Sequence, residues 1–217
     1  YYSATLYDLL NLPTLECWTT LSALAAETKR IRLTPLVLAN PYRPPALLKQ
    51  IRAFADSNSI GISAHVAESK SVVEAVRKQH GRNGVVEFLH QFGITAPDSI
   101  FAHSVHVTTD EIRLLKETGT SVSHNPVSNM MLGDGVAPVV EMLRYGVNVA
   151  LGTDGAASNH SQDLFDTMKA ASLLQKVHHQ DAGVIKPYEV LRMATAGGVK
   201  ALGNDSICGT IEAGKRA

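Results

Sequence analysis

The stretch that decides the fold is residues 61–69, GISAHVAES, in which a short apolar run ends in the polar pair His65 and Glu68. Three later apolar runs end in the same way: IFAHSVH at 100–106, SVSHNP at 121–126 and VALGTDG at 149–155. Helix-like runs separate these stretches, and strands that alternate with helices favour a parallel sheet. Polar residues at successive strand ends are typical of the catalytic rim of a β/α barrel. The sequence therefore predicts an α/β fold of the (β/α) TIM-barrel type, with parallel strands and outer helices.

The expected elements follow from apolar periodicity and from turn residues. Strands are predicted at 31–38, 60–66, 99–105, 120–124 and 147–151, with Pro35 weakening or shortening the first. Helices are predicted at 15–29, from Pro45 onward, near 69–92 with a break at 81–84, and at 108–117, 138–146, 163–177 and 187–203. Five strands are too few to close such a barrel, so we expect a partial barrel. Its two exposed sheet edges predict a homo-oligomer, or filling of the gap by the first 50 residues.

The bulk composition excludes several classes of partner. The 217 residues include 20 Lys and Arg against 20 Asp and Glu, so the formal charge of zero argues against nucleic acid or an anionic membrane as partner. No apolar run approaches the ~20 residues that span a bilayer. The start of the chain lacks the basic region of a signal peptide. Cys17 and Cys208 show no metal-like spacing and are expected to be thiols, which predicts a cytoplasmic protein.

The pair His65 and Glu68 has the spacing H-x-x-E at a strand end. A histidine there can bind a metal while a glutamate three residues on takes and returns a proton. Asp154, in a G-T-D-G turn, can bind a metal and deprotonate an attacking water. The alternatives are an exposed loop pair for the first two residues and an ordinary turn aspartate for the third.

His103 ends the next strand and can be a further metal ligand or polarise a substrate. His124 precedes Asn125 and Pro126, and either contacts a substrate or makes a structural hydrogen bond that shapes the loop. The other histidines are expected to cap, pack or lie on the surface: His80, His90, His106, His160, His178 and His179. The order of the polar strand ends along the chain, more than any single residue, indicates a catalytic site.

In these motifs the chain from about residue 56 to 217 resembles the metal-dependent amidohydrolase superfamily. It is most similar to the branch of methylthioadenosine/S-adenosylhomocysteine deaminases and triazine or cytosine aminohydrolases. The matching stretches are HVAES at 65–69, AHSVHVTTDEI at 102–112, VSHNPVSNMMLGDGVAPV at 122–139, LGTDGAASNHSQDLFDTMKAASLLQK at 151–176 and GTIEAGKRA at 209–217. The resemblance implies hydrolytic deamination of an amino-substituted heterocycle by metal-activated water.

Residue by residue, the resemblance implies that His65, His103 and Asp154 surround a divalent metal, zinc first and iron as the alternative. Glu68 and His124 are implied as substrate-binding residues, and Glu68, His103 and Asp154 as the catalytic ones. The H-x-H pair that supplies two further ligands in the family is absent, since none of the nine histidines lie two positions apart. An open three-ligand site remains, and we expect it to bind metal weakly.

Residues 1–50 resemble a different family, the luciferase-like flavin or deazaflavin monooxygenases. The resemblance covers a helix, a strand and the following helix, with Tyr42, Arg43, Pro44 and Pro45 in a loop near the cofactor. The two resemblances meet near residues 47–56, which predicts a chimera: a luciferase-like segment at 1–50 and the C-terminal half of an amidohydrolase barrel at 51–217, packed as one domain.

Three functions follow as hypotheses. The first is a metal-dependent aminohydrolase of the family type, acting on a small heterocycle. The second is a catalytically silent chimeric scaffold that has lost the H-x-H pair. The third, a flavin-dependent oxidoreductase, is supported only by residues 1–50, and we do not expect bound flavin.

Overall fold

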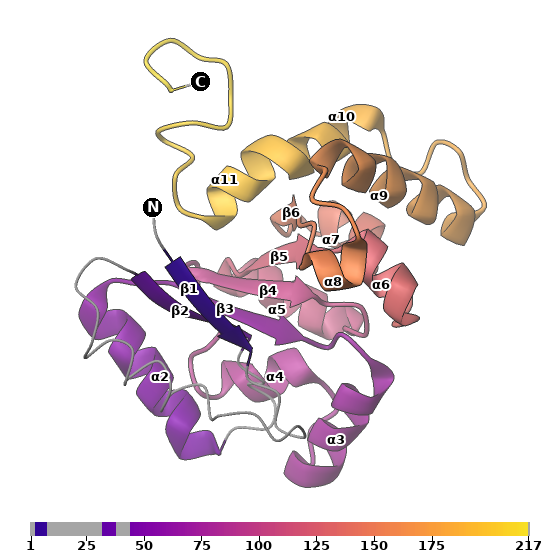
Figure 1. The fold of residues 1–217 in the computed structure, drawn as a ribbon. Coiled ribbons are helices and arrows are strands. Elements are labelled where there is room, and N and C mark those ends of the chain that lie inside the picture. The colour runs from indigo at the N-terminus through magenta and orange to yellow at the C-terminus, as the bar shows by residue number, and fades with distance from the viewer. Residues whose placement is uncertain (1–2, 8–31, 38–43, 217) are drawn as a thin grey trace.

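The computed structural model describes residues 3–7, 32–37 and 44–216 (Figure 1). Its strands are β1 (Ser3–Tyr7), β2 (Arg32–Val37), β3 (Ile62–Val66), β4 (Ser99–His103), β5 (Ser121–His124) and β6 (Val149–Leu151). Its helices are α2 (Pro45–Asn58), α3 (Lys70–His80), α4 (Val85–His90), α5 (Thr109–Thr118), α6 (Pro126–Leu132), α7 (Val139–Arg144), α8 (Ala156–Asn159), α9 (Leu164–His179), α10 (Pro187–Arg192), the π-helix η2 (Met193–Gly197) and α11 (Gly198–Ala201). None of these helices is long and apolar enough to cross a membrane.

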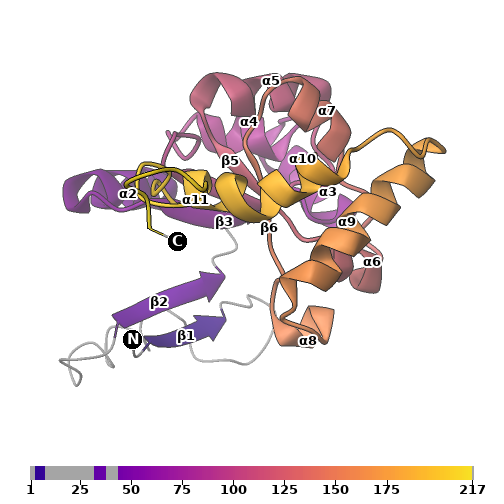
Figure 2. The ribbon, with the colours of Figure 1, turned by 90° about the horizontal axis from the view of Figure 1, so that it is seen from above.

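The strands β3, β4, β5 and β6 form one sheet in chain order, and every neighbouring pair is parallel. The strands β1 and β2 pair in parallel as a separate two-stranded sheet. Figure 2 shows α4, α5 and α7 on one side of the larger sheet and the β1–β2 sheet on its other side. The prediction of parallel strands with intervening outer helices is therefore confirmed.

The core lies between the larger sheet and the helices that follow its strands. Leu89 of α4, Leu115 of α5 and Met142 of α7 are completely buried. Phe101 in β4 is also completely buried, and its neighbour Ala102, which points to the opposite face, is 9% exposed. Burial on both faces explains why the strands read as continuous apolar runs rather than as an alternation of apolar and polar residues.

A single carboxylate connects the beginnings of α4 and α5. Thr108 and Glu111 form the predicted capping box: Glu111 N donates to Thr108 Oγ1 at 3.2 Å, and Thr108 N donates to Glu111 Oε2 at 2.9 Å. The other carboxylate oxygen accepts a 2.7 Å hydrogen bond from Val86 N, in the first turn of α4. Gly84 leaves room for this carboxylate, because a Cβ atom there would overlap it. Glu111 is fully buried, so its oxygens depend on these backbone donors.

Most predicted elements are confirmed. The strands predicted from residue 60 onward appear within about two residues of their expected bounds, and Pro45 begins α2 as expected. The region 69–92 divides into α3 and α4 after Gly81, which has a left-handed φ of 62°. Pro35 did not end β2 early, because β2 belongs to a two-stranded sheet in which a proline is tolerated at an edge.

Two differences have physical reasons, and one prediction falls on residues that the structure does not describe. The segment after β5, expected to be a loop, forms α6, since Pro126 occupies its first turn, where no N–H is needed. The helix predicted over 187–203 divides into α10, η2 and α11, and Gly197 passes so close to β6 that a Cβ atom would lie 2.5 Å from Val149 O. The helix predicted over 15–29, together with Cys17, Tyr42 and Arg43, lies outside the described residues.

We predict that Glu111→Ala lowers the free energy of unfolding by about 2–3 kcal/mol, because it leaves the buried Val86 N–H without an acceptor and removes the capping box. Urea denaturation followed by circular dichroism measures this change. Glu117→Ala, at an exposed position on the same helix, serves as the control and should change stability by no more than about 0.5 kcal/mol. Equal losses in the two variants would contradict the role given to Glu111.

Candidate metal and catalytic site

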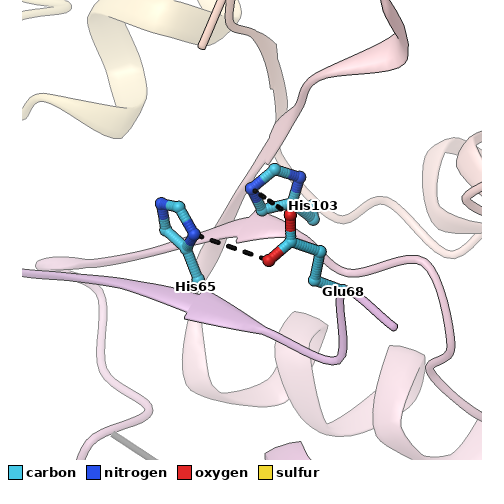
Figure 3. A group of neighbouring side chains, drawn as sticks. All are labelled: His65, Glu68 and His103. Atoms are coloured by element: carbon cyan, nitrogen blue, oxygen red, sulfur yellow. Dashed lines mark ion pairs between the residues drawn. The ribbon is translucent and has the colours of Figure 1, made fainter. Parts of the chain in front are cut away.

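Three of the predicted site residues converge at the carboxyl ends of β3 and β4 (Figure 3). Glu68 Oε2 lies 3.6 Å from His65 Nδ1, and Glu68 Oε1 lies 3.5 Å from His103 Nε2. The two imidazole rings meet edge to face with their centroids 4.7 Å apart. One ligand atom from each of the three residues lies within 4.8 Å of the others, so the group has the dimensions of a metal site. His103 is completely buried, whereas His65 and Glu68 are partly open.

The backbone at these strand ends adopts conformations that residues other than glycine rarely take. Ala67, His103 and Asp154 have φ values of 48°, 68° and 59°. At His103 the chain makes a tight three-residue turn, because Ser104 N donates to Ala102 O at 3.0 Å. Strain of this kind collects at functional sites, where it aims a side chain in a direction that a relaxed strand would not allow.

Two backbone hydrogen bonds fix the loop after β3 against the loop after β4. Ser104 N also donates to Val66 O at 3.0 Å, and His106 N donates to Ala67 O at 2.9 Å. Both bonds lie within two residues of Glu68 or His103. They therefore hold the carboxylate beside the buried imidazole without help from the side chains themselves.

Burial and charge set the protonation of Glu68 and His103. Burial raises the pKa of Glu68, but the polar contact with His65 and the attraction to the protonated forms of the His65 and His103 imidazoles outweigh this and lower the pKa below its ordinary value. Burial lowers the pKa of His103, and the neighbouring Glu68 carboxylate only partly opposes that shift. At neutral pH the site therefore presents an ionised Glu68 beside a neutral His103.

Asp154 lies near this group but is not one of its members. Gly155 N donates to its Oδ1 at 2.8 Å, and Ser158 Oγ donates to its Oδ2 at 3.0 Å. Burial raises the pKa of Asp154, but the nearby Ser128 hydroxyl, these two hydrogen bonds and the charge of His103 lower it further, to below the ordinary value. Ser128 Oγ itself forms no hydrogen bond of normal geometry with the described residues, so it acts on Asp154 as a nearby dipole. Asp154 is therefore a carboxylate at neutral pH.

His124, the last residue of β5, is buried with neither ring nitrogen hydrogen-bonded to any described residue. Burial, followed by the charge of His103, lowers the pKa of His124 to about 3, so its imidazole is neutral. The hydrogen bond at this residue comes from the main chain, where Gly152 N donates to His124 O at 3.0 Å. The imidazole thus keeps both nitrogens available for a ligand.

The sequence did not single out Asn129, a fully buried residue of α6. Its Nδ2 lies 2.9 Å from His103 Nδ1, on the side of the ring that faces away from Glu68. His106, expected to cap or pack, lies close by, with Nε2 2.7 Å from Asp134 O. An amide in a short helix directly after a polar strand end was the only signal that could have drawn attention to Asn129.

Comparison with known proteins assigns the chain to a family. The sequence profile of the Amidohydrolase family matches residues 11–217. The chain belongs to the amidohydrolase family. A crystal structure of an adenosine deaminase from Xanthomonas campestris with bound zinc is similar to it with a TM-score of 0.83 and 30% identity, over 99% of this chain and 50% of that chain.

Two curated relatives agree with this assignment. The 5'-deoxyadenosine deaminase of Methanothermobacter thermautotrophicus is 45% identical over 185 residues, which cover 83% of this chain and 43% of the relative. The 5-methylthioadenosine/S-adenosylhomocysteine deaminase of Desulforudis audaxviator is 41% identical over 178 residues, which cover 82% of this chain and 41% of the relative. The chain therefore spans less than half the length of these relatives.

The family match includes residues 11–50, and nothing in these comparisons supports a luciferase-like segment or a chimera. The described part of that region, β2 followed by α2, is a strand–helix unit of the kind that every β/α barrel contains. A resemblance carried by one such unit does not separate one barrel family from another. The amidohydrolase assignment therefore extends to most of the segment that had been attributed to the monooxygenases.

We predict that His65→Ala and His103→Ala each weaken zinc binding, measured by isothermal titration calorimetry. The loss should exceed the ~10-fold that removing an outer partner of a ligand already costs. His178→Ala, an exposed histidine of α9, is the control and should leave the affinity unchanged. Zinc affinity that is the same in all three variants would show that the two imidazoles do not hold the metal.

Proposed function

We propose that the chain carries the centre of a metal-dependent aminohydrolase, which deaminates an amino-substituted heterocycle by addition of water. The observation that carries this proposal is the Glu68 carboxylate lying between two imidazoles, at 3.6 Å from His65 and 3.5 Å from His103. A carboxylate so placed can take a proton and return it within a site that also offers nitrogen ligands.

The donor set fits a divalent metal. Two imidazoles and a carboxylate are ligands that zinc prefers, and His103 Nε2 is buried without a hydrogen-bond partner among the described residues. His65, His103 and Asp154 would hold the ion, zinc by preference and iron as the alternative. When bound at these residues, the metal would lower the pKa of a coordinated water toward neutrality.

The protons of the reaction are carried by the two carboxylates. Adding water to the ring carbon forms a carbon–oxygen bond, and releasing ammonia breaks the bond from that carbon to the exocyclic nitrogen. One proton must travel from the water to the leaving nitrogen, and a ring nitrogen must be protonated for the carbon to accept attack. Asp154 accepts the proton of the water, and Glu68 exchanges protons with the heterocycle. His103 adds to this by polarising the water or the substrate.

The names of the relatives indicate the class of substrate. They are deaminases of 5'-deoxyadenosine, of 5-methylthioadenosine and of S-adenosylhomocysteine, all of which carry an adenine ring. An adenosine derivative is therefore the first substrate to test, with triazine or pyrimidine rings as the wider class. The neutral, unpartnered His124 is suited to a hydrogen bond with such a ring, since its two nitrogens offer one donor and one acceptor.

A silent scaffold remains the second candidate for a specific reason. None of the nine histidines lie two positions apart, so the H-x-H pair expected from the family is not present in these 217 residues. A site with fewer nitrogen ligands binds zinc less tightly.

Whether two chains pair through the free edges at β3 and β6 also stays a prediction, for which light scattering is the test.

We predict that the chain, loaded with zinc and given 5'-deoxyadenosine or 5-methylthioadenosine, releases ammonia, and that Glu68→Gln reduces this rate by at least about 100-fold because the amide cannot carry a proton. Asp154→Asn should have a comparable effect, because it removes the base that accepts the proton of the water. Ammonia is measured by a coupled enzymatic assay.

Glu74→Gln, an exposed glutamate on the helix that follows, is the matched control and should retain the wild-type rate. Glu68→Gln with the wild-type rate would disprove the proton-carrying role. A wild-type chain that binds zinc but releases no ammonia from any adenosine derivative would favour the silent scaffold.

A further inference from the structure

Asn129 occupies an unusual position for an amide. Its side chain is completely buried, in the helix that follows β5, and is held between two polar groups. The Nδ2 atom lies 2.9 Å from His103 Nδ1 and 3.5 Å from Asp134 Oδ2. The Oδ1 atom is also buried but has no hydrogen-bond partner among the described residues. A buried carbonyl oxygen without a donor is unfavourable, so a reason for its presence is needed.

The hydrogen bond to His103 determines which ring nitrogen carries the proton. An amide nitrogen is a donor only, so a ring nitrogen that it contacts must be the acceptor. In this arrangement the proton of the neutral ring sits on Nε2, which faces Glu68 Oε1 at 3.5 Å. A protonated Nε2 has no lone pair to give to a metal.

Turning the amide of Asn129 by half a rotation exchanges its two ends within the same volume. The oxygen then lies opposite His103 Nδ1 and accepts a hydrogen bond from it. The ring proton moves to Nδ1, and Nε2 presents its lone pair to the centre. The same rotation gives Asn129 Oδ1 a donor, moves Nδ2 to the place where Oδ1 had no partner among the described residues, and leaves the lone pair of His103 Nε2 ready for a ligand. Each orientation thus leaves one end of the amide without a partner there, so neither is excluded by hydrogen bonding.

Asp134 opposes that rotation. Its carboxylate accepts from Asn129 Nδ2 in the present orientation, and it would face the amide oxygen after the turn. At 3.5 Å this contact is weak, so it biases the orientation of the amide without locking it.

We propose that Asn129 is a positioning residue that selects the ring tautomer of His103, and that Asp134 biases this choice toward the tautomer that cannot bind a metal. The proposal rests on the proposed function in that His103 is taken to face the metal. It adds a control on metal binding that the ligands alone do not provide, since an amide can serve either tautomer whereas a carboxylate serves only one.

The test is the ring tautomer of His103, read from two-bond nitrogen–proton NMR spectra of ¹⁵N-histidine-labelled protein at mildly alkaline pH. The His103 signals are identified by their loss in His103→Ala. In the wild-type chain before zinc is added we expect the proton on Nε2, and after zinc is added on Nδ1. Asn129→Asp, whose carboxylate is acceptor only, should place the proton on Nδ1 before any zinc is added. Asp134→Asn should shift the population in the same direction, because its amide can donate to the turned oxygen.

Zinc affinity gives the second readout. Asn129→Leu, whose side chain cannot hydrogen-bond to either tautomer of His103, should lower the zinc affinity by about 10–100-fold. Asn129→Asp should retain most of the wild-type affinity. Asn148→Leu is the matched control: it removes hydrogen bonds to Ser121 Oγ and Gly197 O in a partly buried amide without contacting the site.

Two results would overturn the proposal. One is a His103 tautomer that is the same in the wild type, Asn129→Asp and Asp134→Asn before zinc is added. The other is a loss of zinc affinity in Asn129→Leu no larger than that in Asn148→Leu. Because the tautomer is read before metal or substrate is present, a chain that shows the shifts but deaminates nothing would refute the proposed function and leave this inference standing.

Discussion

The parallel pairing of β3, β4, β5 and β6 is the constraint on which the site depends. Parallel strands bring their carboxyl ends to the same edge of a sheet, so residues far apart in sequence meet there. In the register of β3 and β4, His65 lies beside Ala102 and Val66 beside His103. This register brings both residues to one edge of the sheet, but because they are offset by one position their side chains would point to opposite faces of regular strands. The left-handed φ of 68° at His103 departs from that alternation, and the two rings meet with their centroids 4.7 Å apart.

Backbone strain turns that proximity into a defined geometry. Ala67, His103, Ser104 and Asp154 all have positive φ, each at a cost of about 1–3 kcal/mol. Elsewhere the structure offsets this cost with buried hydrogen bonds, such as those that Glu111 accepts at the beginnings of α4 and α5. The contrast is instructive, since Glu111 is as buried as His103 but has hydrogen-bond partners for both oxygens. His103 and His124 keep buried nitrogens without hydrogen-bond partners in the described part of the chain, which is the condition expected where a ligand is to be bound.

What could be predicted from the sequence was local. Apolar runs that end in His65, His103, His124 and Asp154 predicted the strands and their polar ends. They did so because a strand that is buried on both faces has a continuous apolar sequence. The role that we propose for Asn129 of α6 could not be predicted, since it depends on a contact with His103, which ends β4 and lies 26 positions away in the chain. The resemblance of residues 1–50 to another family went wrong for a related reason: a single strand–helix unit carries too little information to identify a family. The π-helix at 193–197 was not predicted either, and the close approach of Gly197 to Val149 O in that segment is likewise a non-local contact.

The hydrogen bonds of Asp154 determine which of the two carboxylates, Asp154 or Glu68, is suited to bind a metal and which to transfer protons. Glu68 already contacts both imidazoles, so a cation that enters the group must either bind Glu68 or displace it from His103 Nε2. If Glu68 were a ligand, one of its oxygens would be engaged by the metal and only the other could exchange protons with a substrate. Asp154 offers an alternative, because Gly155 N and Ser158 Oγ each engage one of its oxygens once. Each oxygen keeps a further lone pair, and the carboxylate, with its lowered pKa, remains charged. In the proposed function, Asp154 would therefore join the metal without giving up the hydrogen bonds that orient it, which would leave Glu68 free to carry protons.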